Sequence, residues 1–388
     1  MTDWSVERTI RFLPFAVFVA TFDRAVIAPM LLGMGQDFGV DLATITLAAS
    51  AYYLAYGLAQ PVWGLVSDRL GRIATMRLAL VLAGVMDLVS VVAMPVEMFI
   101  VTRAVAGAMM AGVFPTAVIF IGDTIEDKNK RQPAIASLQT GVALGLTLGT
   151  VLGGIGIATI GWQAFFVATA IVCFAIAWFV RNMPNPKPGP DRVPALESFR
   201  IVLTDRWPWI LYLLVFVEAG VLLGVFALVP AALEQTGSSA AVAGIAAAGY
   251  GISVLLSSMV VRRLSIRVPA HRFLLVGGIC ATLGFALLAV TVTPVTVFVS
   301  VLLQGVAWVA MHTTLQTWAT TLSDRARATA VSLFAGFMFL GNGVGATIAG
   351  YVLDFEGSTA LFLGATVVMV ALTATAVISR LRYSVRLG

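Results

Sequence analysis

The stretch Gly64-Leu65-Val66-Ser67-Asp68-Arg69-Leu70-Gly71-Arg72 lies between two long apolar segments. Gly64 allows two helices to approach closely, and Gly71 allows the chain to turn sharply. Asp68 can face the positive end of another helix, while Arg69 and Arg72 can bind carboxylates or lipid phosphate. The stretch therefore predicts a structured loop that joins two membrane-spanning helices and meets a further helix.

Apolar segments of similar length recur along the whole chain of 388 residues. Hydrophobic residues make up 60% of the sequence, charged residues make up 11%, and the mean hydropathy is +0.98. This composition leaves too little polar material to cover a soluble globule. A spanning helix needs roughly 20 apolar residues. The sequence predicts an all-α membrane protein with twelve spanning helices, near residues 10–32, 43–65, 73–94, 98–121, 133–157, 162–182, 208–231, 241–261, 273–293, 295–320, 326–352 and 358–380.

Positive charge marks one side of the membrane. Of the 24 Lys and Arg residues, all except Arg24 and Arg103 lie in alternate gaps between the apolar segments or at the ends of the segments that border those gaps. Cytoplasmic loops accumulate Lys and Arg, so these gaps and both termini are expected to be cytoplasmic. Because the positive residues are spread over separate loops, the basic pI near 9.5 does not indicate nucleic-acid binding, and no nucleic-acid partner is expected. The opposite gaps carry only acids: Asp37, Asp41, Glu97, Glu234, Asp354 and Glu356.

A hydrophilic, proline-rich stretch from Arg181 to Arg206 divides the predicted helices into six and six. Such a stretch is typical of a linker, here with a short surface helix at Ala195 to Leu203. We therefore expect an N-terminal six-helix bundle at 1–182, a cytoplasmic linker at 183–207 and a C-terminal six-helix bundle at 208–388. The equal division suggests an internal repeat.

The loop from Gly64 to Arg72, between the second and third predicted helices, resembles the signature loop of the major facilitator superfamily. The resemblance implies the fold of that family, in which two pseudo-symmetric six-helix bundles have both termini in the cytoplasm. It also implies that the loop locks the cytoplasmic side in the outward-open state, with Asp68 facing the start of helix eleven near Ser323 to Ala326. A solvated turn is the alternative interpretation.

Two further segments resemble motifs of this family. Arg103 and Gly107, one turn apart on the fourth helix, resemble an arginine–glycine motif of proton-coupled members. A glycine stripe on the fifth helix resembles a motif of drug:proton antiporters, although Thr150 stands where that motif has proline. Small residues at this spacing are also a general device for close helix packing, so the direction of transport stays open. The stripe comprises Gly141, Gly145, Gly149, Gly153 and Gly154.

Six ionisable residues lie inside the predicted spans, away from the cytoplasmic ends of those spans. A charge at the bilayer centre costs about 2.5 kcal/mol or more, so each is a functional candidate. Helices one and four line the central cavity in the resembling family, and Asp23 and Arg103 are therefore expected to pair. Arg103 stays charged whereas Asp23 can take up a proton, so Asp23 is the expected proton carrier. A buried pair that only fixes helix packing is the alternative. The six residues are Asp23, Arg24, Asp87, Arg103, Glu218 and His312.

The other intramembrane charges have less certain partners. Arg24 points about 100° away from Asp23 around the helix, so it serves a different partner, and Asp87 on the third helix is one candidate. Glu218, near the middle of the seventh helix, is expected to face the cavity as a second site for protons or for a cationic substrate. The alternative for Glu218 is a neutral side chain packed inside the bundle.

A polar stripe on the tenth helix predicts part of the substrate cavity. Gln304, Trp308, His312 and Gln316 recur at four-residue spacing and therefore share one face. This face is too polar for lipid, and it offers hydrogen bonds and an aromatic surface to a substrate. A proton role for His312 is the less favoured alternative.

The second and eleventh helices add further candidates for the cavity. Tyr52, Tyr56 and Gln60 form a comparable stripe on the second helix, with aromatic packing at the membrane interface as the alternative. Asn342 on the eleventh helix contributes an amide.

The sequence also limits the source of energy and the chemistry. It contains no phosphate-binding Gly-x-x-x-x-Gly-Lys-Ser/Thr loop and no soluble domain that could hold a nucleophile and a base, so neither an ATPase nor another enzyme is expected. Cys173 and Cys280 lie in opposite halves, so no metal site is expected. The expected function is proton-coupled export of small amphipathic or drug-like compounds by alternating access, driven by the proton gradient without a cofactor. A proton-coupled symporter that imports a sugar, an organic acid or another metabolite is the alternative.

The expected setting follows from this function. The partners are membrane lipid, a small-molecule substrate and the proton, and the chain is expected to act as a monomer. The expected location is the inner (plasma) membrane of a bacterium, which the chain crosses many times.

Overall fold

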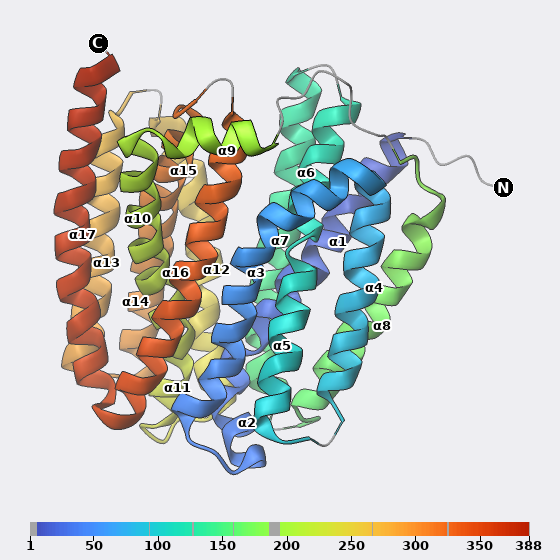
Figure 1. Ribbon diagram of the computed structural model, residues 1–388. Coiled ribbons are helices and arrows are strands. Elements are labelled where there is room, and N and C mark those ends of the chain that lie inside the picture. Colours follow the sequence, from blue (N-terminus) through green and yellow to red (C-terminus); the bar gives the residue numbers. More distant parts are fainter. Residues whose placement is uncertain are drawn as a thin grey trace.

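The computed structural model describes residues 6–92, 94–125, 128–157, 159–185, 195–265, 267–323 and 326–387. Throughout these residues the regular structure is helical, and 12 helices are long and apolar enough to span a membrane. The twelve spanning helices predicted from the sequence are thereby confirmed. Figure 1 shows that α1 begins and α17 ends at the same end of the molecule, which we call the termini end.

The first six spans contain several breaks. The first span continues from α1 through a 3₁₀ turn to α2, and the fourth consists of α5 and α6. The elements are α1 (Val6–Val26), η1 (Ala28–Met30), α2 (Leu31–Phe38), α3 (Leu42–Leu70), α4 (Arg72–Ser90), α5 (Val96–Met110), α6 (Val113–Thr124), α7 (Lys128–Gly156), α8 (Trp162–Phe179) and η2 (Val180–Asn182).

The second six spans follow a surface helix, α9 (Ala195–Leu203), which covers the segment where the sequence predicts one. The seventh and tenth spans are interrupted by π-helical turns, η3 and η5. The elements are α10 (Arg206–Ala219), η3 (Gly220–Val225), η4 (Phe226–Leu228), α11 (Val229–Glu234), α12 (Ala240–Leu264), α13 (Ala270–Val290), α14 (Pro294–Ala307), η5 (Trp308–His312), α15 (Thr313–Thr320), α16 (Arg327–Phe355) and α17 (Gly357–Leu387).

The two halves repeat the same packing. In the first half α1 packs on α7, α3 on α5 and α4 on α8. In the second half the equivalent helices make the equivalent pairs, with α10 and η3 on α16, α12 on α14, and α13 on α17. The internal repeat that was only weakly visible in the sequence is therefore a property of the fold.

Local sequence explains where α3 begins and ends. The Asp41 carboxylate accepts a hydrogen bond from Thr44 N at 2.7 Å, which caps the first turn of the helix. Hydrogen bonds from the side chain and backbone of Thr44 hold the pKa of the exposed Asp41 below its usual value. At the other end Gly71 adopts φ 90°, a conformation that favours glycine, and α4 begins at the next residue.

The glycines of α7 provide its close packing on α1. A Cβ on Gly149 would lie 2.9 Å from the Ala25 Cβ, and one on Gly153 would lie 2.7 Å from the Val26 carbonyl oxygen. Gly145 meets the Phe18 carbonyl in the same way. The last residue of the stripe, Gly154, instead faces α12 of the second half, where a Cβ would lie 2.7 Å from the Ala240 carbonyl oxygen.

The two bundles meet mainly along α3 and α16 and along α7 and α12. On α3 and α16 the close contacts run from Thr46 with Gly350, at the end opposite the termini, to Gly57 with Gly336 near the middle. At the opposite end Ala43 N also donates a hydrogen bond to Asp354 Oδ2 at 3.3 Å. Two turns beyond Gly57, a Cβ on Gly64 would meet nothing within 4 Å. The bundles are therefore closed on each other at the end opposite the termini, and at Gly64 the side of α3 that a Cβ would occupy is open.

Candidate functional site

Three buried charges form a cluster inside the first bundle. The guanidinium of Arg103 on α5 lies between two carboxylates, with Nη2 2.8 Å from Asp87 Oδ1 on α4 and 3.6 Å from Asp23 Oδ2 on α1. All three side chains are almost completely buried. The structure thus joins Asp23 to Arg103 as the sequence suggests, and it adds Asp87 as the closer partner.

Aromatic rings and a glycine hold the arginine of this cluster in place. The Arg103 guanidinium lies over the ring of Phe166 at 4.4 Å and over that of Tyr52 at 5.5 Å. One turn along α5, Gly107 packs directly on the Tyr52 backbone carbonyl, so α3 and α5 approach closely at this point. The arginine is therefore sandwiched between aromatic faces and carboxylates, an arrangement that a guanidinium fits well.

A second buried pair lies in the other bundle. His312 Nδ1 at the end of η5 lies 2.9 Å from Glu218 Oε2 on α10, and both side chains are buried. The indole of Trp308 stacks on the His312 ring with centroids 3.9 Å apart and an interplanar angle of 8°. Because the π-helical turn needs more than four residues per turn, residues 308 and 312 lie almost directly above one another.

The polar stripe of the tenth span is less uniform than its spacing implies. Trp308 and His312 share a face, as predicted. Gln304 is completely buried and donates to Ser300 Oγ at 2.9 Å, while Gln316 is exposed on α15. The four residues therefore have different surroundings and do not form one continuous polar face of a cavity.

Aromatic side chains connect the two bundles near the middle of the spans. The rings of Tyr52 and Tyr56 stack at 6.3 Å, and Tyr56 contacts Phe339 of α16 at 4.1 Å. Gln60 and Asn342 are buried on α3 and α16. The structure thus places Tyr56 of the predicted second-helix stripe at the boundary between the bundles, whereas Tyr52 lies against Arg103 in the first bundle.

Arg24 and Asp87 do not pair, in contrast to the contact considered from the sequence. Asp87 is bound to Arg103, whereas the Arg24 guanidinium lies over the ring of Phe339 at 5.3 Å. The Arg24 backbone carbonyl accepts a hydrogen bond from Tyr53 Oη at 3.1 Å. The reason is rotational, because Arg24 points to the second bundle and Asp87 points into the first.

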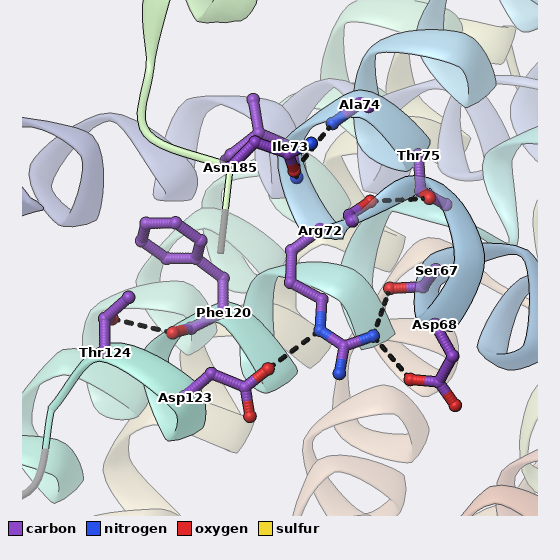
Figure 2. A network of polar contacts seen from close by, with 11 residues as sticks. Ser67, Asp68, Arg72, Ile73, Ala74, Thr75, Phe120, Asp123, Thr124 and Asn185 are labelled. Atoms are coloured by element: carbon purple, nitrogen blue, oxygen red, sulfur yellow. Dashed lines mark hydrogen bonds and ion pairs between the residues drawn. The ribbon is translucent and has the colours of Figure 1, made fainter. Parts of the chain in front are cut away.

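The loop from Gly64 to Arg72 is held by a buried arginine (Figure 2). Arg72 Nη1 lies 2.7 Å from Asp68 Oδ1 and 2.9 Å from Ser67 Oγ, and its Nε lies 2.8 Å from Asp123 Oδ2 on α6. Arg72 is fully buried, whereas Arg69 is exposed at the same turn. The segment near Ser323 to Ala326, expected opposite Asp68, falls partly outside the described residues.

Asn185 is a member of this loop network that the sequence did not single out. Its Oδ1 accepts from Ile73 N at 2.9 Å and from Ala74 N at 3.3 Å (Figure 2). Its Nδ2 donates to the Leu70 carbonyl at 2.9 Å. A Cβ on Gly71 would lie 2.5 Å from the Asn185 amide. Asn185 therefore caps α4 from the start of the linker, more than a hundred residues away in sequence.

Comparison with known proteins agrees with this architecture. The model of the Major Facilitator Superfamily matches residues 13–235 and 219–385. The chain is 24% identical over 377 residues to the multi-drug resistance efflux pump PmrA of Streptococcus pneumoniae, and the match covers 93% of each chain. It is 29% identical over 335 residues to the multidrug resistance protein MdtG of Dickeya zeae, covering 83% of this chain and 81% of that protein.

Another relative is longer. The chain is 28% identical over 193 residues to the efflux pump dotC of Dothistroma septosporum, a match that spans 49% of this chain but only 32% of that protein. 

Solved structures share the fold at low identity. A bacterial homolog of the human lysosomal transporter Spinster, in an inward-facing and unoccupied conformation, superposes with a TM-score of 0.76 at 19% identity, covering 98% of both chains. The nucleoside transporter NupG superposes with a TM-score of 0.75 at 15% identity, covering 98% of this chain and 99% of that one. The family match over nearly the whole chain shows that the protein belongs to the major facilitator superfamily, whose members are membrane transporters and not enzymes.

Proposed function

We propose that this transporter exports small amphipathic compounds from a bacterial cell in exchange for protons. Its site is the boundary between the two bundles, which move relative to each other and expose that site to one side of the membrane at a time. The named efflux pumps among its relatives support export. The proton gradient supplies the energy, and the chain acts as a monomer, without a cofactor or a nucleic-acid partner, in the inner membrane with its termini in the cytoplasm.

The cluster of Asp23, Asp87 and Arg103 is the observation that carries proton coupling. Two carboxylates share one guanidinium in a fully buried place. With both carboxylates ionised the cluster has a net charge of −1, and with one proton bound it is neutral. Charge inside the membrane is costly, so the cluster has a reason to gain and lose one proton during the cycle. Asp23 has the longer contact and can exchange that proton while the Asp87–Arg103 hydrogen bond stays intact.

The contacts between bundles support the conformational part of the cycle. The bundles are closed at the end opposite the termini, while a Cβ on Gly64, toward the termini end, would meet nothing within 4 Å. With the termini in the cytoplasm, this arrangement corresponds to a state open to the inside. In the reverse state, the loop held by Arg72 would come against the second bundle, and Gly64 would provide room for that contact.

The test is proton movement in proteoliposomes that contain the purified protein and a trapped pH dye. Lipophilic cations, sugars and organic acids are added one at a time under an imposed pH gradient. We expect protons to move opposite to an amphipathic compound in the wild type, and this movement to be lost in Asp23→Asn. Glu218→Gln tests the second candidate for the carrier.

A matched control and an opposite result make this test decisive. Glu97→Gln removes an exposed acid at the start of α5 and should leave the proton movement unchanged. Proton movement in the same direction as a sugar or an acid would replace export with symport. Substrate exchange without any proton movement would end the proton coupling proposed for Asp23.

A further inference from the structure

Arg24 is the intramembrane charge that has no ion-pair partner among the residues that the structure describes. Of the six ionisable residues inside the spans, five are held in two groups: Asp23, Asp87 and Arg103 in one bundle, and Glu218 and His312 in the other. Within the part of the chain that the structure describes, no carboxylate lies within 4.0 Å of the Arg24 guanidinium. The Arg24 guanidinium lies over the Phe339 ring, and the Arg24 backbone carbonyl accepts a hydrogen bond from the Tyr53 hydroxyl.

Burying the Arg24 charge inside the membrane costs free energy. An arginine near the middle of a spanning helix costs about 2.5–3.5 kcal/mol or more, and its guanidinium does not lose its proton in a protein. A neutral side chain of similar length could fill the same space without that cost. The charge is therefore explained by a partner that is present only during part of the cycle.

The position of Arg24 places that partner between the bundles. Arg24 belongs to α1, while Phe339, the ring beneath its guanidinium, belongs to α16 of the second bundle. Arg24 is only partly buried, whereas the nearby rings of Tyr53, Tyr56 and Phe339 are buried. Part of the Arg24 surface therefore stays accessible next to the aromatic rings at the boundary between the bundles.

The rings provide the second half of a binding site. Tyr56 and Phe339 contact at 4.1 Å, Tyr53 stacks parallel to Phe339 at 6.5 Å, and Phe226 contacts Tyr250 at 4.6 Å. Aromatic walls with one fixed charge are typical of sites for amphipathic ligands. A guanidinium presents paired N–H donors that match the oxygens of a carboxylate, phosphate or sulfonate.

The acids nearby do not offset this preference. Asp23 is adjacent in sequence but turned toward Arg103, and Glu218 of the other bundle is engaged by His312. A lipophilic cation placed on the rings beside Arg24 would meet the positive charge of the guanidinium at closest range. We propose that the transported compound is an amphipathic anion, with its oxyanion group on Arg24 and its apolar body on the aromatic rings of Tyr53, Tyr56 and Phe339.

This inference rests on the proposed transport function, because it needs a molecule to enter between the bundles. It does not depend on proton coupling or on the direction of transport. Its test is therefore an equilibrium binding measurement, separate from the proton-movement experiment above.

The experiment compares three probes that share one alkyl chain: octanesulfonate, octyltrimethylammonium and octanol. Isothermal titration calorimetry is performed on the full chain in nanodiscs of zwitterionic lipid, with empty nanodiscs as the baseline. Wild type should bind octanesulfonate more tightly than the other two probes. Arg24→Gln should weaken octanesulfonate binding about tenfold or more, the expected loss of a charge-assisted hydrogen bond, and should not weaken binding of the cation.

Two variants separate this role from general electrostatics. Arg24→Lys keeps the charge but not the paired donors and should bind the anion with intermediate affinity. Arg181→Gln removes an exposed positive charge that stacks on Trp178 at the termini end, and it should bind all three probes like the wild type.

A measurement on the wild type alone guards against a variant that fails to fold. Phenylglyoxal modifies accessible arginines, and peptide mass spectrometry locates the modified residues. Octanesulfonate should protect Arg24 from modification, and octyltrimethylammonium should not.

Several results would overturn the proposal: no anion-selective binding by the wild type, an anion affinity unchanged in Arg24→Gln, or no protection of Arg24. If anion binding fails while a cation still drives proton movement, the proposed function stands and the anionic substrate is wrong. If Arg24-dependent anion binding is found without proton movement, the binding site stands and the coupling is wrong.

Discussion

The carboxylate of Asp87 lies 2.8 Å from the guanidinium of Arg103, with both side chains buried in the first bundle. This contact gives Arg103 a hydrogen-bonded ion-pair partner on the neighbouring helix, α4. The second carboxylate, Asp23, is at 3.6 Å and belongs to the helix that also carries Arg24 to the boundary between bundles. The two acids of the cluster are therefore expected to differ in their roles.

Substitution of the two acids should separate stability from coupling. Asp87→Ala leaves Arg103 with a weakened set of partners, and breaking a buried pair costs about 3–5 kcal/mol, so the thermal unfolding temperature should fall clearly. Asp23→Asn keeps the shape of the side chain and should change that temperature much less while abolishing substrate-driven proton movement. Equal loss of stability in both variants would contradict this division.

Gly107→Ala should damage the site through packing alone. The added methyl group would collide with the Tyr52 backbone carbonyl and push α3 away from α5, next to Arg103. Overpacking of this kind costs about 1–3 kcal/mol, which thermal unfolding in detergent can measure. The matched control is Gly364→Ala on α17, where a Cβ meets nothing within 4 Å and no loss of stability is expected.

Gly71→Ala should destabilise the loop for two reasons that a double mutant can separate. The backbone at φ 90° is unfavourable for alanine, and its Cβ would collide with the Asn185 amide. Asn185→Ala loses three hydrogen bonds but removes the collision, so the combined variant should lose less stability than the sum of the single variants, by about 0.5 kcal/mol or more. Gly64→Ala, in open space in the same loop, should leave stability unchanged. Strict additivity would show that Asn185 and Gly71 act independently.

Cysteine chemistry should report which end of the boundary is closed. In a background without Cys173 and Cys280, Thr46→Cys combined with Gly350→Cys should form a disulfide that stops transport until it is reduced, because these positions touch in the closed end. Gly64→Cys should react with a membrane-impermeant maleimide supplied on the termini side. A protected Gly64→Cys together with an uncrosslinked Thr46→Cys and Gly350→Cys pair would indicate the opposite resting state.

Much of this fold is readable from the sequence because the membrane imposes a simple rule on composition. A span must be apolar over its whole length, so all twelve helices were predicted within a few residues at most boundaries. The larger differences between predicted and observed boundaries lie at the ends of a few spans. The first span, for example, continues past Pro29 through a 3₁₀ turn and ends at Phe38.

The site was less predictable because contacts depend on how each helix is rotated. Asp87 could be recognised as a buried charge, but its choice of Arg103 over Arg24 follows from the packing of α4 against α5. The extra residue in the π-helical turn at Trp308–His312 changes the phase of the tenth span, so an even four-residue spacing did not place Gln304 and Gln316 in equivalent surroundings. Asn185 carries no charge and belongs to no motif, and its role is visible only from its position next to the start of α4 in the folded structure.

The anchoring of Asn185 has a mechanical consequence. Asn185 is fastened to the first bundle, and α9, which begins at Ala195, packs on α10 and α16 of the second bundle. The ten peptide steps between these two residues can reach at most about 36 Å when fully extended. The linker thus has a fixed maximum length. It limits how far the two bundles can separate at the termini end before the hydrogen bonds between Asn185 and the loop from Gly64 to Arg72 come under tension.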